Sequence, residues 1–173
     1  MAALRWNRLG LDAHRLSVST SIEQTAQGTR EKPPKNGKAR LIALPALVVE
    51  ELRRHRISQA EQLLALGVRQ TDDTYICLRE DGSPWPPRVL THAFARLIRA
   101  SGLTKVRLHD LRHGHATHLL VANTHPKVVQ ERLGHANIQL TLDTYSHVLP
   151  SMQDDAATTI DAAMRAALKR SDW

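Results

Sequence analysis

The stretch from Val106 to Val148 constrains this chain most, because two short histidine motifs and a tyrosine follow one another within it. These are His109-Asp-Leu-Arg-His113, Leu133-Gly-His135 and Tyr145. In a helix, residues three and four apart share a face, so Arg112 and its two flanking histidines fall within an arc of about 100°. Guanidinium and imidazole groups held in this way donate hydrogen bonds to phosphate oxygens. The stretch predicts a phosphate-directed face, followed along the chain by a tyrosine hydroxyl that can attack phosphorus.

Helix signals surround these motifs. A first helix is predicted over 109–121, and its apolar stripe is formed by Leu108, Leu111 and Leu119. Pro126 opens a second helix that Gly134 ends. The remaining histidines of the first helix, His115 and His118, are interpreted as packing residues, and Asp110 as a residue that orients its neighbours.

A third helix follows, with Asn137 as its cap. Tyr145 lies on one side of this helix with Ile138 and Leu142, at helical spacing. On its own, this spacing is more typical of a core tyrosine whose hydroxyl lies at the rim. The sequence therefore leaves two interpretations of Tyr145 open, a reactive residue and a packed one.

Upstream, the sequence predicts a β-hairpin. Strands are expected at Leu16–Ile22 and Arg40–Leu44, joined by a loop whose turn is Pro34-Lys-Asn-Gly-Lys38. Lys35 is then near a mobile tip. Such lysines are usually solubilising, but a lysine on a hairpin can also donate a proton to a leaving oxygen in phosphoryl transfer.

The other elements are predicted to be mostly helical. Helices are expected over 45–56, over 58–66 with Gly67 as its stop, over 88–100 with Phe94, Leu97 and Ile98 inward, and over 151–169, and one strand over 75–78. The fold class is therefore α+β, mainly α-helical with a small antiparallel β-sheet, in one domain over 1–173.

The net positive charge of the chain indicates the class of binding partner. The chain has a net charge of +7, distributed as +6 over residues 1–56, +3 over 57–136 and −2 over 137–173. A basic surface is typical of proteins that bind a polyanion, although it is as often simply solvated. No run is long enough to cross a membrane, no signal peptide is visible and Cys77 is the single cysteine, which together predict a cytoplasmic protein.

Taken in order, these residues resemble the catalytic domain of the tyrosine recombinases, the phage integrase family of site-specific DNA recombinases. The resemblance extends from Ala3-Leu-Arg-Trp6 through Lys35-Asn-Gly-Lys-Ala-Arg40 and the two histidine motifs to Thr141-Leu-Asp-Thr-Tyr-Ser-His147. It implies DNA integration or excision by strand cleavage and rejoining through a 3′-phosphotyrosyl intermediate, with no cofactor and no metal. It also implies double-stranded DNA as partner, and self-association in trans through the C-terminal helix.

The resemblance also assigns roles by position. Tyr145 would be the nucleophile, and Arg112 would hold the non-bridging phosphate oxygens. His109 and His135 would bond the phosphate or assist proton transfer, and Lys35 would protonate the 5′-oxygen leaving group. His113 matches the histidine after the motif arginine and is given a supporting or structural role.

One catalytic residue of the family is not matched by any residue of this chain. The family carries another catalytic arginine in a Gly-Leu-Arg-x-x-Glu segment just before Ala3-Leu-Arg-Trp6, and Arg5 belongs to the later motif. We expect a chain without that segment and without the amino-terminal core-binding domain to cleave DNA poorly, because removing one charge-stabilising donor costs roughly 3 to 4 kcal/mol.

Two alternatives come from other functional classes. A fragment with the same basic face can act as a non-catalytic DNA-binding remnant of an integrase. The i, i+4 spacing of His109 and His113 also resembles the zinc motif H-E-x-x-H, but Asp110 replaces the glutamate and Arg112 would repel a dication.

Overall fold

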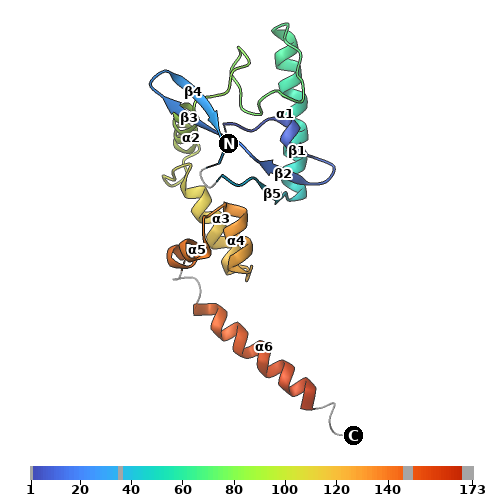
Figure 1. Ribbon diagram of the computed structural model, residues 1–173, viewed down its shortest axis with the longest axis vertical. Coiled ribbons are helices and arrows are strands. Elements are labelled where there is room, and N and C mark those ends of the chain that lie inside the picture. Colours follow the sequence, from blue (N-terminus) through green and yellow to red (C-terminus); the bar gives the residue numbers. More distant parts are fainter. Residues whose placement is uncertain (1, 35–36, 146–149, 169–173) are drawn as a thin grey trace. The chain divides into compact units, whose positions relative to one another are not determined.

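The computed structural model describes residues 2–34, 37–145 and 150–168. Two compact units divide the chain, Met1–Leu108 and His109–Trp173, and each is described here by itself. The first holds all of the β-strands of the described chain and two long helices, and the second holds four helices (Figure 1). The predicted α+β class with a small antiparallel sheet is confirmed.

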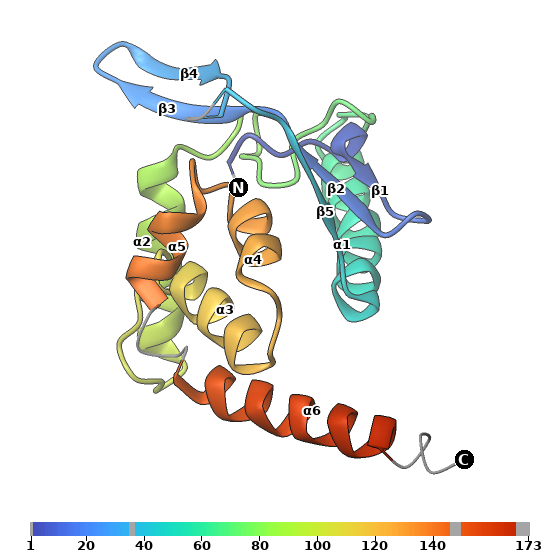
Figure 2. The ribbon, with the colours of Figure 1, turned by 60° about the horizontal axis from the view of Figure 1, so that its bottom comes forward.

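A three-stranded antiparallel sheet organises the first unit, in the order β1 (Leu9–Gly10), β2 (Arg15–Val18), β5 (Arg40–Ala43). Leu16 lies opposite Ile42 in this register, so the predicted pairing of the two strands is confirmed. The helix α1 (Ala46–Ala65) runs alongside the sheet in both views (Figures 1 and 2).

The connection between these two paired strands is a second hairpin, which the sequence analysis missed. β3 (Ser21–Thr25) pairs with β4 (Gly28–Lys32), so the predicted strand Leu16–Ile22 is divided in two. The tight turn is possible because Gly28 has a φ of 128°. Glu23 forms ion pairs across the ribbon, at 2.7 Å with Lys32 and at 3.8 Å with Arg30. Cross-strand pairs of opposite charge therefore stabilise residues that had been taken for loop.

The helix α1 is continuous from Ala46 to Ala65, so the predicted break before Ser58 is wrong. Neither glycine nor proline occurs within it, and Ser58 therefore continues the helix instead of capping a new one. The predicted stop is confirmed, since Gly67 has a φ of 74° and lies directly after the C-cap Leu66.

The core of the first unit forms where α1 meets the start of the chain. Trp6 is 1% exposed, and its indole Nε1–H donates to Gln59 Oε1 at 2.7 Å. The amide of Gln59 donates in turn to the carbonyls of Tyr75 and Ile76, at 3.1 and 3.0 Å. A buried amide is tolerated here because both of its ends have partners.

Residues 75–78 do not form the predicted strand. They make isolated bridges instead, between Arg5 and Tyr75 and between Leu78 and Pro84. The guanidinium of Arg5 lies 3.9 Å from the ring centre of Tyr75, bonds the Tyr75 hydroxyl and forms ion pairs with Glu31 at 2.8 Å and Asp73 at 2.6 Å. Side-chain contacts thus supplement short stretches of backbone pairing, such as the bond from the N–H of Ile76 to the carbonyl of Leu4 at 2.8 Å.

The predicted helix over 88–100 is confirmed as α2 (Pro87–Ala100), with proline in its first turn. Phe94 and Ile98 are half-buried. Leu97 is 61% exposed, so the prediction that it points inward is wrong.

The second unit begins with three packed helices, α3 (Asp110–Val121), α4 (Pro126–Leu133) and α5 (Ile138–Tyr145) (Figure 2). Its core is the cluster Ala116, Leu120, Val129, Leu133 and Tyr145, with Leu119 packed against it. The predicted stripe of α3 is therefore wrong in part, because Leu111 is 49% exposed.

The helix ends in this unit follow the predicted signals. Gly134 adopts the left-handed conformation after α4, with a φ of 72°, and the side chain of Asn137 accepts a hydrogen bond from the backbone N–H of Leu140 at 3.0 Å. His125 caps α4 by accepting from the N–H of Lys127 at 3.1 Å.

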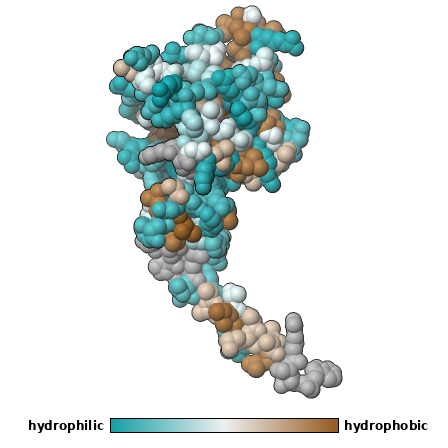
Figure 3. Space-filling view, in the orientation of Figure 1, coloured by the Kyte–Doolittle hydropathy of each residue, from teal (hydrophilic) through white to brown (hydrophobic). Residues whose placement is uncertain are grey.

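The last helix, α6 (Pro150–Leu168), carries an apolar line. Ile160, Met164 and Leu168 recur at intervals of four and are 60%, 61% and 66% exposed. Brown and pale side chains along α6 are visible in Figure 3. In the described residues, no helix is both long enough and apolar enough to span a bilayer.

Candidate active site

The first turn of α3 gathers three of the predicted site residues. His109 is the N-cap, and its carbonyl accepts from the backbone N–H of Arg112 at 3.0 Å, which winds the chain into the helix. The rings of His109 and His113 meet edge to face, with their centres 5.0 Å apart. Both histidines are exposed and Arg112 is half-buried. The two histidines of the motif thus lie side by side.

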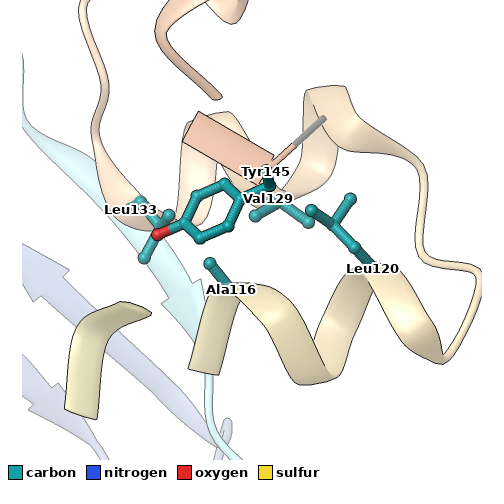
Figure 4. Close-up of a cluster of buried hydrophobic side chains, with 5 residues drawn as sticks. All are labelled: Ala116, Leu120, Val129, Leu133 and Tyr145. Atoms are coloured by element: carbon teal, nitrogen blue, oxygen red, sulfur yellow. The ribbon is translucent and has the colours of Figure 1, made fainter. Parts of the chain in front are cut away.

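Tyr145 ends α5 and lies in the core of the second unit. Its ring is packed with Ala116 of α3 and Val129 and Leu133 of α4 (Figure 4), and the residue is 2% exposed. Burial raises the pKa of the Tyr145 phenol, and the charge of Arg112 acts in the opposite direction. The ring of Tyr145 is therefore a packed core residue, whereas its hydroxyl is close enough to Arg112 to feel the charge of the guanidinium.

The hydroxyl of Tyr145 bonds the imidazole of His113. The distance between Tyr145 Oη and His113 Nδ1 is 2.9 Å, and the two ring centres are 6.1 Å apart. Since His113 is exposed, this hydrogen bond connects the buried phenol to an imidazole at the surface. A residue given only a supporting role from the sequence thus makes the direct contact with the tyrosine.

His135 lies in the corner between α4 and α5, where the left-handed Gly134 turns the chain. Its Nδ1 is 2.8 Å from the hydroxyl of Thr141, and its carbonyl accepts from the amide of Gln130 at 2.8 Å. Thr141 is fully buried, one helical turn before Tyr145. The ring of His135 is therefore fixed to the helix that carries the tyrosine.

Lys35, the predicted general acid, lies outside the described residues. The structure thus brings His109, Arg112, His113 and Tyr145 together and ties His135 to α5. Among the residues that are described, no group of three or more histidine, cysteine or acidic side chains is arranged to hold a metal ion.

The sequence profile described as "Phage integrase family" matches residues 1–152. The chain belongs to this family. Among its relatives, the ICEBs1 integrase of Bacillus subtilis is 28% identical over 162 residues, which are 93% of this chain and 44% of that protein. The tyrosine recombinase XerC of Bacillus pumilus is 32% identical over 138 residues, or 79% of this chain and 44% of that protein. This phage integrase chain thus spans less than half the length of either relative.

Solved structures confirm the phage integrase fold. The Tn1549 transposon integrase in complex with circular intermediate DNA has a TM-score of 0.73 at 22% identity, covering 92% of this chain and 54% of the other. The XerH recombinase bound to its palindromic difH substrate has a TM-score of 0.61 at 23% identity, covering 92% and 40%. The fold is that of tyrosine recombinase catalytic domains.

Several polar contacts of this phage integrase chain could not be predicted from the motifs alone. Thr141 and Gln130 are buried partners of His135. The signal available in the sequence was a polar residue directly beside an apolar position of each helix. The interpretation of His115 and His118 as packing residues is wrong, because both are exposed, and His115 accepts a hydrogen bond from Arg132 at 2.9 Å.

Proposed function

We propose that this chain is the tyrosine-bearing part of a site-specific DNA recombinase, which cleaves and rejoins strands through a 3′-phosphotyrosyl link at Tyr145. The observation that carries the proposal is the position of the Tyr145 hydroxyl, which is bonded to His113 and lies within the field of Arg112. Membership of the phage integrase family supports the same chemistry.

In this proposal the phenol oxygen attacks phosphorus, the bond from phosphorus to the 5′-oxygen breaks, and the link retains the energy of the phosphodiester. Arg112 binds the non-bridging oxygens, where charge accumulates in the transition state. His109 and His135 hydrogen-bond the same phosphate, and Lys35 supplies the proton to the leaving oxygen. No cofactor is needed, because rejoining is the reverse of cleavage.

DNA is the proposed partner because the chain is basic and the related Tn1549 and XerH structures are described as DNA complexes. Lysine and arginine contacts to phosphates release counterions, so binding weakens steeply as salt rises. A DNA substrate would also place the reaction in the cytoplasm.

A second candidate is a DNA-binding module that does not cleave. The observation that favours it is the burial of Tyr145, which is 2% exposed in this structure. Attack on a DNA phosphate requires the Tyr145 hydroxyl on α5 to be accessible to that phosphate, whereas DNA binding does not.

The test uses the 173-residue chain and a library of duplexes, each with a nick beside randomised sequence, so that cleavage releases a short strand and traps the protein. We expect a covalent adduct that forms slowly, because the 173-residue chain does not carry the second catalytic arginine, and whose peptide maps to Tyr145 and is lost in Tyr145→Phe. Salt-sensitive binding without an adduct would favour the non-catalytic module.

We also propose that copies of the chain associate on DNA through α6. The exposed line of Ile160, Met164 and Leu168 supports this, because apolar side chains at helical spacing are typical of a docking face. Sedimentation with and without DNA measures the association.

A further inference from the structure

We infer that His113 is the base that takes the phenol proton from Tyr145 during strand cleavage, a role that the family resemblance does not give it. The inference rests on the proposed function, because it concerns the same reaction. Its geometric basis is the 2.9 Å separation of His113 Nδ1 and Tyr145 Oη, which is within the range for proton transfer along a hydrogen bond.

The surroundings of the hydroxyl favour His113 over the other groups nearby. His109 meets the ring of His113 rather than the tyrosine, and Arg112 is a permanent cation that cannot accept a proton. On the core side, the phenol ring is packed with carbon atoms of Ala116 and Val129 (Figure 4). Among the described residues, His113 is the hydrogen-bond partner of this hydroxyl.

The phenol needs such a base. Burial raises the pKa of Tyr145, and the charge of Arg112 opposes that effect only in part, so the hydroxyl keeps its proton at neutral pH. A neutral phenol is a weak nucleophile, and its attack becomes efficient when a positioned group removes the proton as the new bond forms.

The step balances within the site and the DNA. His113 starts neutral, with its proton on Nε2 and a lone pair on Nδ1. The bond between Tyr145 Oη and phosphorus forms as the phenol proton moves to Nδ1, and the 5′-oxygen departs with a proton from the general acid. His113 becomes an imidazolium and, because it is exposed, can release its Nε2 proton to water while Nδ1 keeps the proton from the phenol. In rejoining, the 5′-hydroxyl returns its proton to the general acid, Nδ1–H protonates the departing phenolate, and water restores the proton on Nε2.

The protonation state is tested first, without DNA, by nitrogen NMR of the chain labelled in histidine. Near neutral pH we expect Nδ1 of His113 to be unprotonated and to accept from the phenol, and its resonance to shift in Tyr145→Phe. A proton on Nδ1 that is donated to Tyr145 would overturn the inference, whatever the chain does to DNA.

Cleavage of the nicked duplexes is the second test. We expect His113→Ala and His113→Asn to form adduct about 100 to 10,000 times more slowly than the unaltered chain, as loss of a general base predicts. The asparagine is decisive, because its side-chain oxygen can still accept from the phenol but cannot take its proton. Restoration of the rate by His113→Asn would show a merely structural role and overturn the inference.

A chemical rescue separates a base from a packing residue. Added imidazole should restore part of the rate of His113→Ala, because free imidazole can occupy the space of the lost ring and accept the phenol proton. Circular dichroism of each variant checks its folding. His118→Ala, on the exposed side of the same helix, is the matched control and should cleave normally.

The two proposals fail in different ways. If the unaltered chain forms no adduct, the proposed function is overturned, while the NMR result alone still decides whether Nδ1 can accept the proton. If the adduct forms and either His113→Asn or His113→Ala cleaves at the normal rate, the function stands and the assignment of the base is wrong.

Discussion

The imidazole of His135 and the hydroxyl of Thr141 are hydrogen-bonded at 2.8 Å, across the corner that joins α4 to α5. Thr141 is fully buried and lies one turn before Tyr145, so a single bond holds a predicted phosphate ligand and the helix of the proposed nucleophile in one arrangement. Buried polar atoms need partners, which makes this bond important for the stability of the unit as well.

Thr141→Val keeps the shape of the side chain and removes the hydroxyl. We expect the free energy of unfolding in urea to fall by about 1 to 2 kcal/mol, because His135 Nδ1 loses its partner. Thr144→Val is the control, since Thr144 is exposed on the same helix and bonds only the carbonyl of Leu140 among its described contacts. Equal losses in the two variants would mean that the buried bond has no special role.

Gln59→Leu tests the buried amide of the first unit. The variant leaves the indole N–H of Trp6 and the carbonyls of Tyr75 and Ile76 without this partner, so we expect unfolding to become easier by about 3 kcal/mol. Gln62→Leu, exposed one turn away on α1, is the matched control and should change little. Urea titration followed by circular dichroism measures both variants.

The loss of folding stability at acid pH, or acid limb, should depend on Glu31. Hydrogen bonds from Tyr75 and then Arg5 hold the pKa of Glu31 below its ordinary 4.5. A carboxyl with a lowered folded-state pKa stabilises the protein above the unfolded-state value, and that stabilisation disappears as the pH falls through the folded-state value. Glu31→Gln should therefore flatten the loss of stability below about pH 4.5. Glu61→Gln, exposed on α1, should leave that limb unchanged.

Tyr75 should ionise unusually late. Burial, followed by its hydrogen bond to Glu31, raises the pKa of Tyr75 to about 12. A raised folded-state pKa gives stability that is complete below the unfolded value, about 10, and is lost as the pH rises towards 12. Ultraviolet titration of the folded chain should show this late phase and should lose it in Tyr75→Phe. Ionisation near pH 10 in the native protein would contradict the structure.

Met164→Asp tests the proposed association through α6. The substitution puts a charge in the apolar line, so we expect assembly on DNA to weaken while the helical content stays the same. Ala162→Asp adds the same charge on the opposite side of α6 and serves as control. If both variants assemble normally, α6 is not the contact.

Local signals predicted the second unit better than the first. Gly134 and Asn137 mark helix ends because few other residue types adopt left-handed backbone or cap a helix with a side-chain oxygen. Both predictions are confirmed. The hairpin of β3 and β4 was missed because its residues are mostly polar, and only its cross-strand ion pairs show why it forms. The contact of His113 with Tyr145 joins residues 32 positions apart, which helical periodicity cannot predict.

The contacts of Trp6 and Arg5 also set the order in which the first unit can be completed during translation. Trp6 bonds a residue 53 positions later, and Arg5 bonds one 70 positions later. Contacts of such separation form slowly and only after the intervening chain exists. During synthesis, the indole of Trp6 therefore meets Gln59, and the guanidinium of Arg5 meets Tyr75, only after those later residues have left the ribosome.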